Sequence, residues 1–287
     1  MSVIKEKDIT LDGKKYSVHA ELYNSTKSVL DDLKSRTTRI SGYEMKDSDI
    51  HKSWHGVDNW NEALELLRDG YKPIVEQLKS TLKSKTRTEK KTAVVNAVQG
   101  FMPSVPLALK NLPECMLTVD RNVPAARVID LYYDMSSTYS KTVDDFLKAG
   151  KVLLSVIIGL EKQGYRFNMY AVQSYPRYSS GTVDFLCVKV KSSDKPLDIK
   201  RMSFSLIHPA FFRVIGFDWQ GKSPITRDLG SGRGGDFFRD FSTYTRNLIV
   251  KEMFGENAHY VSSTNLIDGK YEPNIVKEAL EDGKDKK

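Results

Sequence analysis

The sequence has 287 residues, of which 40% are hydrophobic and 28% charged, a composition typical of a globular protein with a sizeable core. Its two cysteines, Cys115 and Cys187, lie far apart and form no ligand cluster with histidine, which excludes a disulfide-stabilised scaffold and a structural zinc site. The formal net charge of +7 leaves two interpretations open, an ordinary basic surface or a surface that attracts nucleic acid. No run of about 18 apolar residues is present. We therefore expect a soluble protein that is kept in the cytoplasm and does not enter a membrane.

Residues 1–120 predict a hairpin followed by helices and short strands. Residues 8–20 predict the hairpin, because an Asp-Gly pair separates two β-rich runs. Helices are expected over 58–70, capped by Asp58, and from 73 onwards, where the pattern ends in a basic run. That run contains Lys83, Lys85, Arg87, Lys90 and Lys91. A strand at 92–98 and a short helix that begins after Ser104 come next, and prolines then indicate a boundary near residue 120.

A regular α/β pattern begins at residue 127. A buried strand at 128–133 is followed by a long helix at 143–163. Strands at 165–172 and 183–190 are joined by a short connection, which favours antiparallel neighbours. The later elements are a helix at 198–215 bent near Pro209, a helix at 236–254, a strand at 259–262 and a closing helix at 273–282. This order predicts an α/β fold with a Rossmann-like open sheet, with residues 1–120 as an α+β attachment and residues 121–287 as the core.

Oxygen-bearing side chains follow the strand at 128–133, in the turn Asp134-x-Ser136-x-Thr138. Ligands of open α/β sheets bind beyond the carboxyl ends of the strands, where this turn is expected to lie. The alternative is that Asp134 and Ser136 cap the start of the following helix.

The Asp134-x-Ser136-x-Thr138 turn resembles the Asp-x-Ser-x-Ser metal-binding turn of von Willebrand factor A-type domains. The succession of elements over 127–190 is also similar to that family. The resemblance implies a von Willebrand A-type core, a Mg²⁺ ion held by the three side chains, and a protein partner whose acidic group completes the metal's ligand shell. This chain has Thr138 where the family has a second serine, and the family's threonine–aspartate turn has no clear match.

Over most of its length the chain also resembles a family of uncharacterised phage and prophage proteins. The segments that carry this likeness are 54–56, 62–64, 100–106, 112–116, 160–166 and 208–217. The resemblance implies a phage origin, with the host cytoplasm or the virion as the place of action. It implies no activity.

Two further features could each serve a function. His208 and Arg213 lie on an otherwise apolar helix, where a hydrogen-bonded structural role is the alternative to a functional pair. The glycine-rich segment 230–235, with Arg233, precedes a helix and is either a phosphate-binding loop or a plain flexible loop. No nucleophile has a base placed beside it by sequence spacing, so no enzyme class is favoured.

The patterns and the two resemblances together lead us to expect a non-enzymatic protein, of the phage origin that the second resemblance implies, that acts as a protein-binding or assembly module through the sheet edge near Asp134. Its partner would be a phage or host protein. The alternative prediction is a basic, nucleic-acid-associated phage protein. Its contact residues would be Lys83, Lys85, Arg87, Lys90, Lys91 and Arg233.

Overall fold

The computed structural model describes residues 2–11, 13–39, 45–83, 94–119, 128–177, 181–226 and 243–269 of the chain. The predicted closing helix, the glycine-rich segment with Arg233 and the part of the basic run that begins at residue 84 lie outside the described residues.

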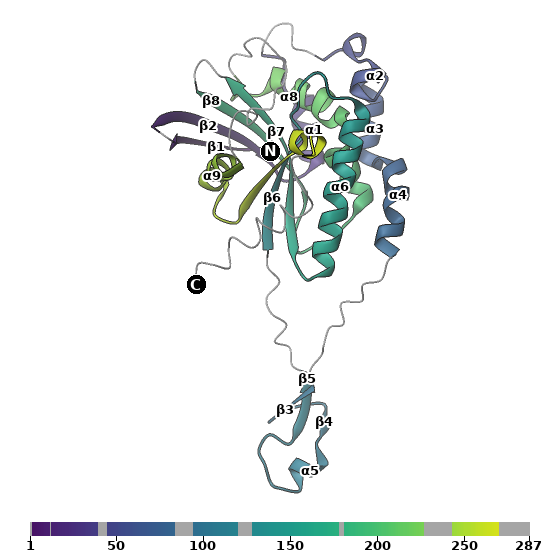
Figure 1. Cartoon of the computed structure of the whole chain (residues 1–287), viewed down its shortest axis with the longest axis vertical. Coiled ribbons are helices and arrows are strands. Elements are labelled where there is room, and N and C mark those ends of the chain that lie inside the picture. The colour runs from purple at the N-terminus through teal and green to yellow at the C-terminus, as the bar shows by residue number, and fades with distance from the viewer. Residues whose placement is uncertain are drawn as a thin grey trace.

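A mixed six-stranded sheet in the order β1-β2-β8-β7-β6-β9 forms the centre of the fold (Figure 1). Its strands are β1 (Val3–Leu11), β2 (Lys14–Tyr23), β6 (Val128–Asp134), β7 (Arg166–Arg177), β8 (Thr182–Lys191) and β9 (Ala258–Ser262). Strand β6 pairs in parallel with β7 and β9, and β2 pairs in parallel with β8. The β1–β2 and β7–β8 pairs are antiparallel. The α/β class, the N-terminal hairpin and the antiparallel β7–β8 pair are therefore confirmed.

Helices cover both faces of the sheet, and Figure 1 shows α6 and α9 on opposite sides of it. The first face carries α1 (Thr26–Ser35), α2 (Lys52–His55), α3 (Trp60–Asp69), α4 (Lys72–Lys83), α6 (Val143–Lys162), α7 (Ile199–Ile207) and α8 (Phe217–Lys222). The second face carries α9 (Thr243–Phe254), while the short helices η1 (Asp47–Asp49) and α10 (Ser263–Ile267) lie in connections. Successive side chains of a strand point to opposite faces. Accordingly, Leu131 and Tyr133 of β6 belong to the first hydrophobic cluster and Tyr132 belongs to the second.

Elements from both sides of the boundary predicted near residue 120 share this core. The β1–β2 hairpin, expected in an N-terminal attachment, completes the main sheet by pairing with β8. Helices α3 and α4 pack against α6 and α7, and their apolar side chains join the first cluster. At Gly70 (φ +77°) an added Cβ would lie 1.9 Å from the Lys200 carbonyl oxygen, so only glycine allows α3 and α7 to come this close.

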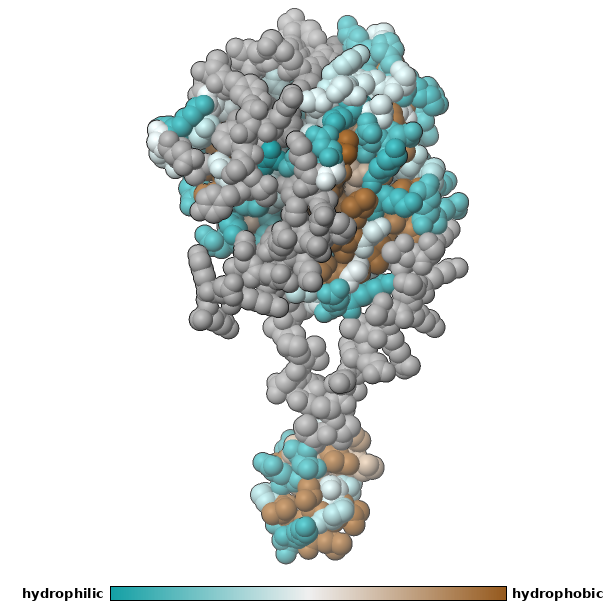
Figure 2. Space-filling view, viewed as in Figure 1, coloured by the Kyte–Doolittle hydropathy of each residue, from teal (hydrophilic) through white to brown (hydrophobic). Residues whose placement is uncertain are grey.

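A small second unit is inserted between α4 and β6. It consists of β3 (Val94–Ala97), β4 (Met102–Pro103), α5 (Val105–Ala108) and β5 (Met116–Val119), with the strand order β3-β5-β4. Figure 1 shows the unit apart from the main sheet, and Figure 2 shows hydrophobic residues on its surface. Its exposed apolar side chains are Val98, Phe101, Met102, Val105, Leu109 and Leu112.

The helix predicted over 198–215 is interrupted at the expected place. Helix α7 ends at Ile207, and after His208 and Pro209 the chain forms the π-helix η2 (Phe211–Gly216) before α8. Proline lacks an N–H group and its ring clashes with the preceding turn, which explains the break. The π-helix brings the Arg213 side chain into the interior, where it is fully buried.

Candidate functional site

The turn after β6 places Asp134 inside the protein, on the sheet face covered by α9. Its side chain is fully buried. Oδ1 accepts a hydrogen bond from the Ser136 amide at 2.8 Å, and Oδ2 accepts from the Ser174 hydroxyl at 2.5 Å and the Tyr260 hydroxyl at 2.6 Å. Burial raises the pKa of the Asp134 carboxyl above its usual range, although these donors act in the opposite direction.

Of the other two residues predicted to form the metal turn, Ser136 is buried beside Asp134 and Thr138 lies at the surface. The Ser136 hydroxyl donates to the Ser174 carbonyl oxygen at 3.0 Å and accepts from the Ser174 amide at 2.8 Å. The Thr138 hydroxyl lies 3.1 Å from the Ser140 hydroxyl on the surface. Helix capping is also wrong for Asp134 and Ser136, because α6 begins at Val143 and its cap is Thr142, whose side chain accepts from Asp145 N–H.

This arrangement does not fit a Mg²⁺ ion. Magnesium needs six oxygen ligands at close to octahedral geometry and usually keeps several waters. Both oxygens of Asp134 already accept hydrogen bonds from buried protein groups, and Ser136 is buried beside it. Within the described ranges, no group of three or more His, Cys, Asp or Glu side chains could hold a metal ion. Asp134 therefore joins β6, β7 and β9 as a buried hydrogen-bond acceptor.

The loop that follows β6 carries Tyr139, which lies against Trp54 of α2. Tyr139 is 80% exposed, and its carbonyl oxygen accepts a hydrogen bond from the Trp54 indole at 3.0 Å. The two rings lie 5.3 Å apart. Beneath them, the Arg213 guanidinium stacks on the Trp54 ring at 4.2 Å and donates to the carbonyl oxygens of Trp54 and Lys141. Burial lowers the pKa of Arg213 to about 10, so the guanidinium is charged at neutral pH and ties the loop after β6 to α2.

His208 has the hydrogen-bonded structural role that was one of its two predicted interpretations. It is 2% exposed, its Nδ1 accepts from the Ala210 amide at 3.3 Å, and its ring packs near Tyr71. Burial lowers its pKa to about 4, so the imidazole is neutral at physiological pH.

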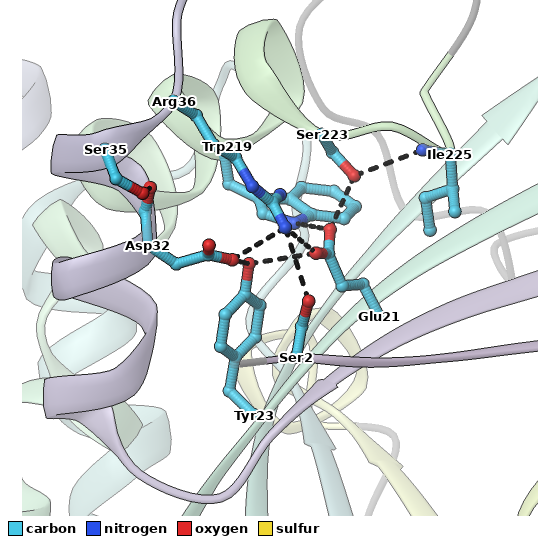
Figure 3. A network of polar contacts seen from close by, with 9 residues as sticks. All are labelled: Ser2, Glu21, Tyr23, Asp32, Ser35, Arg36, Trp219, Ser223 and Ile225. Carbon is cyan, nitrogen blue, oxygen red and sulfur yellow. Dashed lines mark hydrogen bonds and ion pairs between the residues drawn. The ribbon is translucent and has the colours of Figure 1, made fainter.

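A second buried carboxylate, Glu21 of β2, lies at the centre of the network in Figure 3. Its Oε1 accepts from Arg36 at 2.5 Å and lies 3.0 Å from the Tyr23 hydroxyl. Its Oε2 accepts from the Trp219 indole at 2.8 Å and the Ser223 hydroxyl at 2.6 Å. Burial alone would raise the pKa of Glu21, but the bonds from Arg36 and Ser223 outweigh it and lower the pKa below its ordinary value.

Because its donors come from three elements, Glu21 fixes α1 and α8 against β2. Asp32 of α1 extends the network, since it accepts from Tyr23 at 2.7 Å and pairs with Arg36 at 2.6 Å. With both oxygens of Glu21 engaged, the network is suited to holding α1 in place rather than to proton transfer.

A third polar group was not visible in the sequence. Ser17 Oγ lies 3.4 Å from His19 Nε2, and His19 Nδ1 lies 2.8 Å from the buried carboxylate of Asp184. This order is that of a nucleophile, a base and an orienting carboxylate. However, Ser17 lies within a strand, and its amide donates to the Gly181 carbonyl at 3.0 Å instead of pointing at a site for an oxyanion. The group thus joins β2 to β8.

Most residues predicted to contact nucleic acid lie outside the described ranges. Lys83 is the last residue of α4, and Lys85, Arg87, Lys90, Lys91 and Arg233 lie outside the described residues. Across the same described ranges, no helix has the length and apolar character needed to span a membrane.

Comparison with known proteins gives one match. A family model described as a domain of unknown function (DUF7192) matches residues 6–259. No curated protein matches the chain, and no solved structure matches it.

Proposed function

Since the chain belongs to the DUF7192 family of domains of unknown function, we propose a role from its own surface: a non-enzymatic protein-binding or assembly module. Its contact surface is the sheet edge near Asp134, where Tyr139 of the loop after β6 lies against Trp54 of α2. The partner is a protein, because the exposed Tyr139 packed on the partly buried Trp54 offers apolar area and a hydroxyl on a rigid support.

The observation that carries this proposal is the exposure of Tyr139 on a fixed backbone. An 80% exposed tyrosine is a large apolar side chain left in water. Its carbonyl is held by Trp54, and Lys141 in the same loop pairs with Asp268 at 2.5 Å. Little conformational entropy is then lost when a partner binds. A tyrosine held in this way is suited to be a hot spot of an interface.

The von Willebrand A-like core and the phage origin belong to the same proposal. The succession of β6, α6, β7 and the antiparallel β8 supports the von Willebrand A-like core, because it is the succession of elements expected over residues 127–190 from that resemblance. The resemblance of the six segments to phage and prophage proteins supports the second. A phage protein of this kind would act in the host cytoplasm or as part of the virion. The alternative proposal, a nucleic-acid-associated protein, rests on the basic run and on Arg233.

We expect Tyr139→Ala to weaken capture of the protein partner about tenfold or more while changing the free energy of unfolding by less than about 0.5 kcal/mol. The measurement is quantitative mass spectrometry of proteins retained by the immobilised wild-type chain and by the variant, from an extract of cells in which the protein is made. Val152→Ala is the matched control, since Val152 is exposed on α6. A set of retained proteins that is the same for the wild type and Tyr139→Ala would overturn the proposal.

A further inference from the structure

Two adjoining cavities lie at the sheet edge opposite to Asp134. The smaller has a volume of about 260 Å³ and the larger about 620 Å³, and Thr26 and Arg201 line both. Because β8 is antiparallel to β7, the carboxyl ends of β2 and β8 lie at this edge, and Asn24 and Lys191 line the smaller cavity there. Carboxyl ends of strands are where open α/β sheets bind ligands.

The smaller cavity has a strongly basic lining. Lys195 and Arg201 line it with exposed side chains, and Asp198 is the acidic residue among its lining residues. Lys189 also lines it, but its ammonium lies over the Tyr170 ring at 5.7 Å. The Asp198 carboxylate already accepts from the Arg201 amide as the cap of α7. Lys191 also lines the cavity, but its ammonium is buried and pairs with Glu161 at 2.7 Å. The remaining cations give the cavity a positive potential that favours an anion.

Helix α1 adds backbone donors to the same cavity. Its cap Ser25 and first residue Thr26 line the cavity, and its first turn contains no acidic residue. The Ser25 side chain accepts from Ser28 N–H, so the N–H groups of the first two helical residues are left for a ligand or water. The Glu21 network holds α1 in this position through Asp32 and Arg36.

The larger cavity continues along α1 and has a mixed lining. Leu30, Leu64 and Leu67 supply apolar walls. Lys27 and Lys34 of α1 add further positive charge, which Glu65 of α3 partly offsets. The three leucines share this lining with seven polar or charged residues, so the cavity suits a molecule that has both apolar and polar parts.

From these features we propose that the paired cavities bind a phosphorylated small molecule. Its phosphate lies in the smaller cavity against Lys195, Arg201 and the start of α1, where charge-assisted hydrogen bonds are available. Its uncharged part lies in the larger cavity against the leucines. The site is independent of the Tyr139 surface, so either proposal can fail alone.

The test is calorimetric titration of the full chain at low salt with ATP, pyrophosphate, inorganic phosphate and a single-stranded oligodeoxythymidine. We expect saturable binding of ATP, at least about tenfold tighter than that of inorganic phosphate because only ATP also fills the larger cavity. Arg201→Ala and Lys195→Ala are each expected to weaken ATP binding about tenfold or more.

Lys110→Ala is the matched control, because Lys110 is an exposed cation on the small inserted unit, and it is expected to leave ATP binding unchanged. Equal melting temperatures of the variants and the wild type establish that each is folded. No saturable binding of any probe, or ATP binding that persists unchanged in Arg201→Ala, overturns the proposal. Tighter binding of the oligonucleotide than of ATP, lost in Arg201→Ala, also overturns it, because the phosphate would then come from a polynucleotide.

Discussion

Replacing Glu21 with alanine is expected to lower the free energy of unfolding by about 3–5 kcal/mol, the cost of removing one partner from a buried ion pair. The substitution leaves the Trp219 indole and the Ser223 hydroxyl without their acceptor and leaves Arg36 with Asp32 as its remaining carboxylate partner. Trp219 is fully buried, so water cannot replace the carboxylate there without disturbing the core. Chemical denaturation followed by tryptophan fluorescence measures the change.

The control for this substitution is Glu256→Ala, since Glu256 is exposed and its removal is expected to cost less than about 0.5 kcal/mol.

The pH dependence of stability gives a second measurement. The folded pKa of Glu21 lies below its ordinary value of 4.5, so its contribution is complete above that pH and is lost as the pH falls through the folded pKa. The stability difference between wild type and Glu21→Gln is therefore expected to be constant near neutrality and to shrink in acid. A difference that grows in acid would contradict the ionised state of Glu21.

Asp134→Ala is expected to cost about 2–4 kcal/mol, because it leaves several buried donors without an acceptor. These donors are the Ser136 amide and the hydroxyls of Ser174 and Tyr260. Asp134→Asn keeps an acceptor for the amide and is expected to cost less. Added Mg²⁺ is not expected to raise the melting temperature of either variant or of the wild type. A rise in the wild type that Asp134→Ala removes would restore the metal site.

The pH dependence at Asp134 has the opposite sign to that at Glu21. Its folded pKa is raised above the ordinary 3.8, so the folded state holds the proton more tightly than the unfolded state. The wild type therefore loses stability relative to Asp134→Asn as the pH rises from about 3.8 through the folded pKa. Denaturation of both proteins at a series of acidic pH values tests this. A difference in the free energy of unfolding that does not depend on pH would show that the pKa of the Asp134 carboxyl is not raised.

Much of the fold follows from local patterns that the sequence displays. The Asp-Gly pair predicts the β1–β2 hairpin, and the apolar spacing predicts α6 almost to the residue. The parallel pairing of β2 with β8 was not predictable in this way, because Ser17 and Thr182 meet through contacts between distant segments. For the same reason the partners of Glu21, which include Trp219 and Ser223, left no local signal.

At the candidate site, the sequence motif predicts the position of a residue but not its surroundings. The position of Asp134 at the end of a core strand was predicted and is confirmed. Its burial was not, although the alternation of strand side chains contains the information, because Asp134 shares a face with the buried Tyr132. The aromatic surface was missed because Trp54 and Tyr139 are far apart in sequence and are brought together by the buried Arg213.

The pairing of β2 with β8 also affects how the chain emerges from the ribosome. The N-terminal hairpin can form early, but the edge of β2 that joins the sheet finds its partner only after residues 182–188 have been made. Until then this edge offers unpaired N–H and C=O groups that can join another chain. The outer strand β1 is protected by alternating charges in Lys5, Glu6, Lys7 and Asp8, whereas the inner edge is not. Chains that end before β8 are expected to self-associate more than chains that include β8. Sedimentation of both sets of chains after their release from the ribosome would show this.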